Sequence, residues 1–154
     1  MAHTYRDLPA AGTTLQLEVG YAFEDVPGCT DISIDGFKRG VRTPTLLTSP
    51  AVVKKPGMPN FGTLKCKVFY DPNDTIHQEL VSDLTETAAE ASANLKNWKI
   101  IWADGFDVPA NWEFTGFISD FSASATDPET GTVTADTSIE VTDITAFNAG
   151  TPTE

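Results

Sequence analysis

The chain has 154 residues, a formal net charge of −12 and a hydrophobic content of 40%. This length favours a single globular domain that buries roughly 70% of its unfolded surface. The acidic charge argues against nucleic acid as a tightly bound partner, and no apolar run reaches the length of about 18 residues that a membrane span needs. The first residues lack the basic start and apolar core of a signal peptide, so we expect a protein made in the cytoplasm that does not bind membranes.

The charges are unevenly distributed along the chain. No acidic residue occurs between Gly36 and Tyr70, and no basic residue follows Lys99. The basic residues of the first segment are Lys38, Arg39, Arg42, Lys54, Lys55, Lys65 and Lys67. The carboxylates after Lys99 are Asp104, Asp107, Glu113, Asp120, Asp127, Glu129, Asp136, Glu140, Asp143 and Glu154. Two interpretations stay open: the charges solvate an ordinary surface, or they make separate copies of the chain complementary to one another.

The first predicted elements are strands. Residues 1–12 are expected to be a flexible terminus, and the stretch from Thr13 to Phe23 alternates between apolar and polar residues, as a half-buried strand does. Leu15, Leu17 and Val19 share one face of this strand, whereas Gln16 and Glu18 share the other. Gly20 is expected to mark a bend, and a shorter strand is predicted from Cys29 to Ile34 after a turn.

Residues 35–60 have no clear period and contain several prolines and glycines. A loop of about 25 residues in a compact domain is usually functional, and this one is too apolar for a free linker. We therefore expect a long basic loop that docks on its own sheet or on a neighbouring subunit. Its candidate contact residues are Lys38, Arg39, Arg42, Leu46, Leu47, Val52, Val53, Lys54 and Lys55.

A strand followed by a helix is predicted from Phe61 to Leu84. In the strand, Leu64, Cys66 and Val68 share the face that should point into the core. Asp71 is the predicted N-cap of the helix and Pro72 its first residue. The apolar stripe that should lie against the sheet consists of Ile76, Leu80 and Leu84. His77 is expected on the solvent side of this helix, without a partner for a catalytic or metal-binding role.

Three further strands are predicted, at Asn97–Ala103, Asn111–Ser122 and Thr132–Val141. Residues 85–94 should either extend the helix or form a mobile loop, and residues 144–154 should form a flexible arm. The polar face of the last strand consists of Thr132, Thr134, Asp136, Ser138 and Glu140. The predicted fold is therefore mainly β: one domain, a barrel or sandwich of six or seven strands with a single helix on its flank.

The sequence offers no pattern typical of a catalytic or cofactor site. It has no phosphate-binding glycine loop, no nucleophile elbow and no zinc-ligand spacing, so neither an enzyme nor a cofactor or metal is expected. The two cysteines do not form a metal or redox motif. Cys66 is interpreted as a small core residue, and a disulfide between Cys66 and Cys29 is left open.

Three stretches follow one another in a distinctive order. The first is GMPNFGTLKCKVFYDPNDTIHQELVSDL (Gly57–Leu84), in which a Pro-Gly loop enters a strand that leads through Tyr-Asp-Pro-Asn-Asp into a helix. The second is NWKIIWADG (Asn97–Gly105), and the third is the closing hairpin EFTGFISDFSASATDPETGTVTADTSIEVTD (Glu113–Asp143). In order and spacing, these stretches resemble the major tail tube proteins of long-tailed, non-contractile bacteriophages, the siphophage tail tube family.

This resemblance implies a small, β-barrel-like subunit with a flanking helix. Subunits of that family pool their strands into a hexameric ring barrel around a channel, and the rings stack into a tube that conducts DNA. The implied partners are other copies of the chain, the tape measure protein, the tail terminator and the distal tail or baseplate proteins. DNA would pass without tight binding. The implied location is the virion tail, after assembly in the host cytoplasm.

An acidic channel wall would suit this role. Duplex DNA carries one negative charge per about 1.7 Å, and an acidic wall repels it over a Debye length of about 8 Å. From the alternation alone, the hypothetical lumen-facing residues are Gln16, Glu18, Thr132, Thr134, Asp136, Ser138 and Glu140. The same strand faces could equally form the outer wall.

Other classes of protein stay open. A tail terminator or a bacterial secretion-tube protein would share much of this pattern. A carbohydrate-binding β-sandwich is the independent alternative, because Trp98, Trp102 and Trp112 could stack on a sugar. Trp98 and Trp102 share a face with Ile100, however, which favours a core position. Exposed and coplanar tryptophans would support the sugar-binding interpretation.

Overall fold

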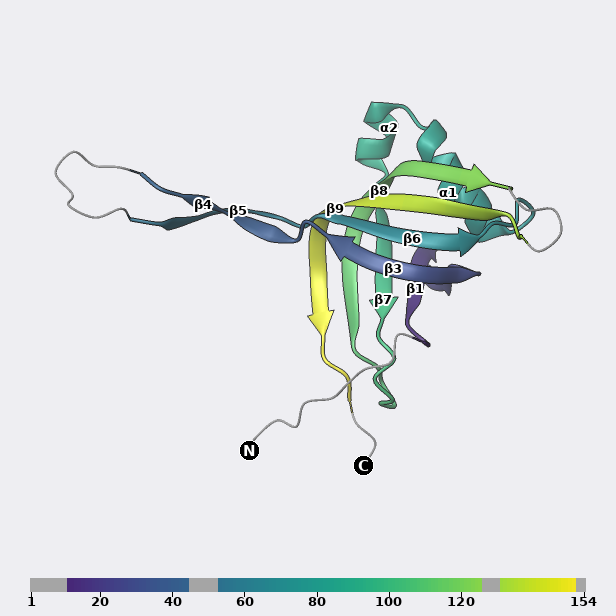
Figure 1. Ribbon diagram of the computed structural model, residues 1–154, viewed down its shortest axis with the longest axis horizontal. Coiled ribbons are helices and arrows are strands. Elements are labelled where there is room, and N and C mark those ends of the chain that lie inside the picture. Colours follow the sequence, from purple (N-terminus) through teal and green to yellow (C-terminus); the bar gives the residue numbers. More distant parts are fainter. Residues whose placement is uncertain (1–10, 45–52, 126–130, 152–154) are drawn as a thin grey trace.

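A computed structural model describes residues 11–44, 53–125 and 131–151, and these form a mainly β protein with helices on one flank (Figure 1). Seven antiparallel strands build one sheet in the order β2-β1-β7-β8-β9-β6-β3, and β4 and β5 form a separate two-stranded sheet. The strands are β1 (Thr14–Val19), β2 (Ala22–Asp25), β3 (Cys29–Asp35), β4 (Lys38–Arg42), β5 (Lys55–Asn60), β6 (Thr63–Phe69), β7 (Lys96–Ile101), β8 (Asn111–Ser124) and β9 (Thr134–Asn148). The helices are α1 (Thr75–Thr85) and α2 (Ala88–Ala93). The predicted mainly β class with a flanking helix is confirmed, but the sheet is open, with β2 and β3 at its edges.

The two longest strands, β8 and β9, divide the sheet into two limbs. β7 pairs with β8 only as far as Gly116, and β6 pairs with β9 only as far as Glu140. We define the four-stranded limb as β3, β6, residues 134–140 of β9 and residues 117–124 of β8. The second limb contains β1, β2, β7 and the other halves of β8 and β9. Three irregularities in the β8–β9 register lie around this division, and the two limbs run in different directions (Figure 1).

The hydrophobic core lies between the limbs, on the concave side of the sheet. Its largest fully buried side chains are Trp98, Leu15, Leu17, Leu64, Leu80, Ile100, Ile139, His77, Val68 and Thr137. The predicted alternation is confirmed in β6 and β7, at Leu15 and Leu17 of β1, and at Ala135, Thr137 and Ile139 of β9, whereas Val19 and Val141 are half-buried and Val133 is exposed. From α1, Ile76 and Leu80 are buried against this core. Each such aliphatic side chain contributes about 1.5–3 kcal/mol through burial.

The single strand predicted from Thr13 to Phe23 is wrong, because the chain reverses within it. β1 and β2 form a tight hairpin in which Val19 pairs with Ala22. The two turn residues, Gly20 and Tyr21, both have positive φ, at +58° and +74°. This is the turn geometry that matches the twist of a hairpin. A bulky residue such as Tyr21 rarely adopts positive φ, and the alternation continues through Tyr21 to Phe23. The sequence therefore does not indicate a turn at this position.

The predicted start of the helix, with Asp71 as its N-cap, is three residues too early. Asp74 is the N-cap, and its carboxylate accepts hydrogen bonds from the backbone N–H groups of Ile76 at 2.9 Å and His77 at 3.2 Å. Asp71 instead accepts from the backbone N–H of Asn73 at 3.0 Å, which stabilises the turn before the helix. Pro72 therefore precedes α1.

The other end of the helical segment also differs from the prediction. Leu84 is 40% exposed, because α1 ends at Thr85 and only its earlier stripe reaches the core. A second short helix, α2, follows within residues 85–94, and a capping box between Thr87 and Glu90 starts it. The expected single helix is therefore two helices.

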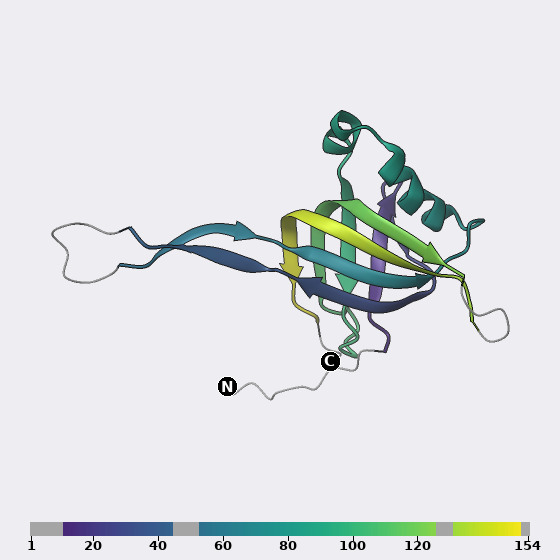
Figure 2. The same ribbon diagram turned by 45° about the horizontal axis from the view of Figure 1, so that its top comes forward.

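The predicted long loop at residues 35–60 is wrong in its described part, which contains a two-stranded arm. We call β4 and residues 53–60, which include β5, the arm; the two strands pair from Lys38 and Asn60 to Arg42 and Lys55, and they project away from the body (Figures 1 and 2). Every residue of β4 is exposed, so no alternating burial marked the strand. Of the predicted contact residues, Leu46, Leu47 and Val52 lie outside the described residues.

The two termini can be compared with the predictions only in part. Most of the expected flexible stretch 1–12 lies outside the described residues. At the other end, β9 continues to Asn148, and Thr151 forms a bridge with Val108, so the first part of the segment 144–154 is paired strand. Within the described residues, no helix has the length and apolar character that crossing a membrane requires.

Candidate assembly interface

The four-stranded limb presents a polar face built from three rows of side chains. Neighbouring strands pair in register, so the rows are Asp31–Lys67–Asp136, Ser33–Lys65–Ser138 and Asp35–Thr63–Glu140. The hydroxyl of Thr63 donates to both carboxylate oxygens of Glu140, at 3.1 and 3.0 Å, and Lys65 forms an exposed ion pair with Asp35 at 3.6 Å. Asp120 lies opposite Ser138 on the adjoining β8. Five carboxylates thus share this face with two lysines.

The opposite face of the same limb is covered by its own chain. Its residues Leu64, Val68 and Ile139 have no exposed surface, and Ala135 is 1% exposed. Along β6 and the first half of β9, only the polar face is therefore open to solvent or to a channel.

The structure separates the candidate lumen-facing residues into two groups. Asp136, Ser138 and Glu140 lie together on the polar face of the four-stranded limb, with Thr134 at the start of β9. Thr132 is exposed and precedes the strand. The remaining two candidates, Gln16 and Glu18, belong to the second limb.

Gln16 and Glu18 are held in local contacts there. The amide of Gln16 donates to the carboxylate of Asp25 at 2.7 Å, and the amide of Asn97 donates to the carboxylate of Glu18 at 3.2 Å. β7 and β8 separate β1 from β9 in the sheet, so the structure does not bring these two residues together with the β9 group.

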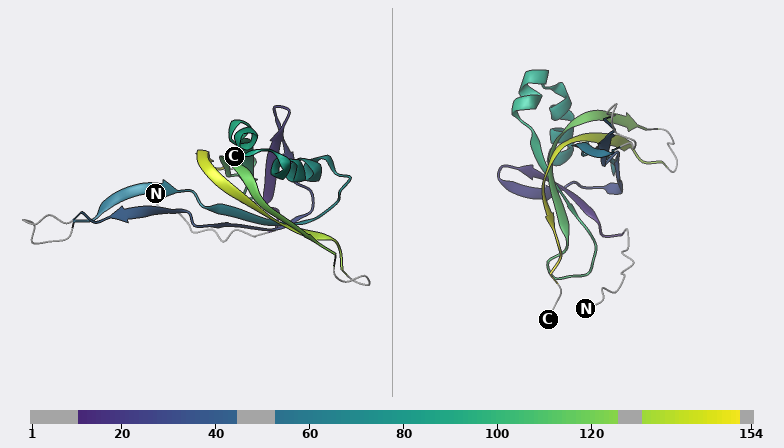
Figure 3. Two further views of the ribbon diagram at one scale, coloured as in Figure 1. Left: turned by 90° about the horizontal axis from the view of Figure 1, so that it is seen from above. Right: turned by 90° about the vertical axis from the view of Figure 1, so that its left-hand side faces the viewer.

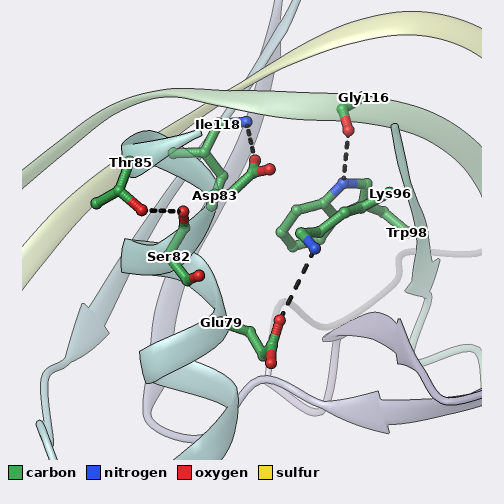
Figure 4. A network of polar contacts seen from close by, with 8 residues as sticks. All are labelled: Glu79, Ser82, Asp83, Thr85, Lys96, Trp98, Gly116 and Ile118. Atoms are coloured by element: carbon green, nitrogen blue, oxygen red, sulfur yellow. Dashed lines mark hydrogen bonds and ion pairs between the residues drawn. The ribbon is translucent and has the colours of Figure 1, made fainter. Parts of the chain in front are cut away.

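The four-stranded limb has two strand edges that differ in character. On one side, β3 pairs only with β6. On the other side, β8 beyond Gly116 pairs only with β9 among the described strands. The start of this second edge is closed by α1, where the buried carboxylate of Asp83 accepts from the backbone N–H of Ile118 at 2.8 Å (Figure 4). The ion pair between Glu79 and Lys96, at 3.8 Å, fastens the same helix to β7. Open edges of this kind are sites of strand pairing with other chains.

His77 is buried, so its predicted position on the solvent side of the helix is wrong. It is 1% exposed and joins two turns. Its Nδ1 accepts from the backbone N–H of Asp71 at 3.0 Å, and its Nε2 donates to the carbonyl oxygen of Pro27 at 2.8 Å. Both ring nitrogens are thereby used in structural contacts. No sequence pattern pointed to this role, because both partners are backbone groups and one lies 50 residues away.

Cys29 on β3 and Cys66 on β6 are both free thiols, and their partners in the strand register are Val68 and Ile32. Cys66 is 4% exposed, which confirms its predicted core position. The hydrogen bond with Cys29 and burial both raise the pKa of the Cys66 thiol well above its ordinary value. The same hydrogen bond lowers the pKa of the half-buried Cys29.

The arm carries the basic residues of the candidate contact set. Lys38, Arg39, Arg42, Lys54 and Lys55 are all exposed. Within the part of the chain that the structure describes, none of them forms an ion pair with a carboxylate. Arg39 donates instead to the carbonyl oxygen of Gly57 at 2.8 Å, across the arm. Val53, 46% exposed, lies just before β5.

The tryptophans do not form a platform for a sugar. Trp98 is fully buried, as predicted, and its indole N–H donates to the carbonyl oxygen of Gly116 at 3.4 Å (Figure 4). Trp102 and Trp112 are half-buried, and their rings meet edge to face at 77° with centroids 5.3 Å apart. Coplanar exposed rings, which sugar stacking would need, are absent from this group.

Comparison with known proteins gives likeness of structure only. No protein-family model matches the chain, and no curated protein does. A sheath–tube complex of an extracellular contractile injection system, PVC, in its extended state, matches with a TM-score of 0.70 and 10% identity over 90% of each chain. The sheath/tube terminator of the same system matches with a TM-score of 0.71 and 10% identity, over 93% of this chain and 98% of the other. The SPP1 tail tube matches with a TM-score of 0.61 and 13% identity, over 96% and 81%.

The chain therefore has the fold found in structures of phage tail tubes and related injection systems. Because the matches include a contractile injection system as well as the SPP1 tail tube, the likeness defines the fold rather than one lineage of tails.

Proposed function

We propose that this chain is a structural subunit of a tail-type tube. The observation that carries the proposal is the four-stranded limb, which is open at both edges, polar on one face and covered by its own core on the other. Pairing β3 of one subunit with the outer half of β8 of the next would remove both open edges. Repeated around a ring, this pairing closes a large barrel with a hole at its centre.

In this proposal the polar face lines the channel, since the other face is buried inside each subunit. Asp136, Ser138 and Glu140 are then lumenal, whereas Gln16 and Glu18 lie outside the channel on the second limb. The five carboxylates of the face are Asp31, Asp35, Asp120, Asp136 and Glu140, and its two lysines are Lys65 and Lys67. This negative excess repels duplex DNA and keeps it mobile in the hole.

The resemblance in sequence order extends the proposal to hexameric rings of a siphophage-type tail. The rings stack into a tube that assembles along a tape measure protein, between a terminator and the distal tail or baseplate proteins. The genome passes through the tube into the host, and the subunit serves in the virion tail as a structural protein without catalysis. The basic arm reaches a neighbouring subunit and meets acidic surface there.

Electron microscopy of the purified protein tests this function. Over a rising concentration series, the expected result is hollow rings that stack into tubes, with a matching rise in sedimentation coefficient. A protein that stays monomeric at every concentration would contradict the proposal.

A ring component that ends a tube is the second candidate. The observation that favours it is the similar fold of the PVC sheath/tube terminator. A terminator forms single rings that do not elongate, whereas a tube subunit forms long stacks. The same micrographs therefore distinguish the two roles.

A further inference from the structure

An apolar hollow lies beside the base of the arm. Most of its lining residues lie outside the polar face that lines the proposed channel. This aromatic groove is lined by Ile32, Ser33, Ile34, Phe37, Trp102 and Trp112. It lies between β3, the start of β4 and the paired ends of β7 and β8. Phe147, which is 56% exposed, continues it by packing edge to face against both Trp112 and Phe37, with ring centroids 5.1 and 6.4 Å apart. A contiguous apolar surface of this kind marks an interaction site.

One carboxylate, Asp31 at the β3 edge of the polar face, lies at the rim of the aromatic groove. Asp31 lines an adjoining hollow that shares Ile32 and Trp102 with the groove. Its side chain is exposed, and it has no ion pair among the described residues. A partner that fits here therefore combines an apolar contact surface with a positive charge.

The arm has this combination of properties. Beyond the irregularity in its register, Val41 pairs with Pro56 and Arg42 pairs with Lys55. Successive residues of a strand point to opposite faces, so one face of the arm is apolar here and the other is cationic. Val41 is 66% exposed and Met58 is 88% exposed, so neither is covered by its own chain.

The arm of one chain cannot fill the groove of the same chain. Phe37 lies in the groove and is also the residue before β4, so the groove sits at the base of the arm. From this base the arm extends away from the sheet, as the tilted view and the view from above both show (Figures 2 and 3). An arm that fills the groove must therefore come from another molecule.

We propose that the aromatic groove receives the apolar face of the arm of a second copy of this chain. Val41 and Pro56 seat against Phe37 and the two tryptophans, with Met58 beside them, while the cationic side of the arm faces the carboxylate at the rim. This inference rests on the proposed function in one respect: it names the surface that the arm meets in the assembly.

Two aspartate substitutions on the apolar face of the arm test whether this face contributes to assembly. Val41→Asp combined with Met58→Asp places two carboxylates on the arm. The control, Tyr21→Asp, places one carboxylate in the fully exposed β1–β2 turn, at the edge of the sheet opposite β3. Circular dichroism should show that both proteins are folded. The arm variant is expected to raise the concentration needed for assembly by more than about tenfold, while the control assembles as wild type does. Equal assembly of both variants would overturn the inference.

Cross-linking tests the location of the contact. A benzophenone label is attached to Val41→Cys in a chain that also carries Cys29→Ser and Cys66→Ala, and the assembled protein is irradiated and analysed by mass spectrometry. We expect cross-links to residues 32–37 and 102–112 of a different copy. Cross-links confined to β6, β9 or the outer half of β8 would overturn this inference and leave the tube function standing. A wild-type chain that never assembles would overturn both.

Discussion

Two glycines at the base of the arm are required by the backbone conformation there. Gly36 and Gly62 have φ values of +78° and +80°, and they lie side by side where β3 continues into β4 and β5 continues into β6. A Cβ at Gly62 would collide with the carbonyl oxygen of Asp35 and with the backbone around Gly36. Only glycine fits this crossing.

Gly62→Ala should therefore destabilise the protein by about 3 kcal/mol, because it adds backbone strain to a steric overlap. Gly20→Ala is the matched control, since Gly20 has a φ of +58° but no atom within 4 Å of the added methyl group. It should cost about 1 kcal/mol from the positive φ alone. Urea denaturation of both variants measures the difference, and equal costs would contradict the packing argument.

His77 joins the loop before β3 to the turn before α1, so its removal should be felt in stability. His77→Ala leaves the N–H of Asp71 and the carbonyl of Pro27 without their partner at a partly buried site, and we expect a loss of roughly 2 kcal/mol. Ser82→Ala, at an exposed position on the same helix, should change the free energy of unfolding by less than about 0.5 kcal/mol. A His77 variant as stable as the Ser82 variant would show that these bonds contribute nothing.

Single residues also mark where sequence reasoning succeeded and failed. The core positions of β6 and β7 followed directly from alternation, because one face of each strand is buried. The N-cap did not, because Asp71 and Asp74 both satisfy the local signal and only the fold decides which one starts the helix. The role of His77 depends on a backbone carbonyl distant in sequence, which no local pattern contains.

At the scale of elements, the arm is the least predictable part. A ribbon exposed on both faces has no reason to alternate, and its prolines and glycines are typical of loops. The same exposure means that the arm contributes little to the core of its own subunit. Its five cations and exposed apolar residues are available to another molecule.

Deletion of residues 38–55 should therefore leave a folded subunit that no longer polymerises. The far-ultraviolet circular dichroism spectrum should keep its β signature, and the thermal transition should stay cooperative, since the core residues are untouched. Micrographs should show monomers or isolated rings instead of tubes. Long tubes from the deletion variant would show that the arm is dispensable for assembly.

At the scale of the whole molecule, the division of the sheet into two limbs separates the polar face of β1 from that of β9. Alternation alone predicts two equivalent polar faces, one on β1 and one on β9, and does not distinguish them. The division at Gly116 and Glu140 does so, because it turns the β1 face and the β9 face in different directions. This long-range bend depends on register irregularities between β8 and β9 that have no local signature.

Charge reversal tests which face lines the channel of the proposed tube. Asp136→Lys combined with Glu140→Lys should slow DNA ejection, because lysines in the channel attract the phosphate backbone. Glu18→Lys combined with Glu24→Lys changes the net charge equally on the second limb and should leave ejection unchanged. Fluorescence of a DNA-binding dye during triggered ejection measures both rates. Slowing by the second pair alone would place β1 in the channel and contradict our assignment.

The unlike edges of the four-stranded limb have a consequence for any conduit built from it. One edge, β3, is bare, whereas the other begins under a helix that holds Ile118 through Asp83. If β3 of each copy pairs with the β8 edge of the next, every copy has the same orientation around the hole, as in a head-to-tail interface. The finished cylinder then has two chemically distinct mouths, so one protein can start its growth and a different one can stop it.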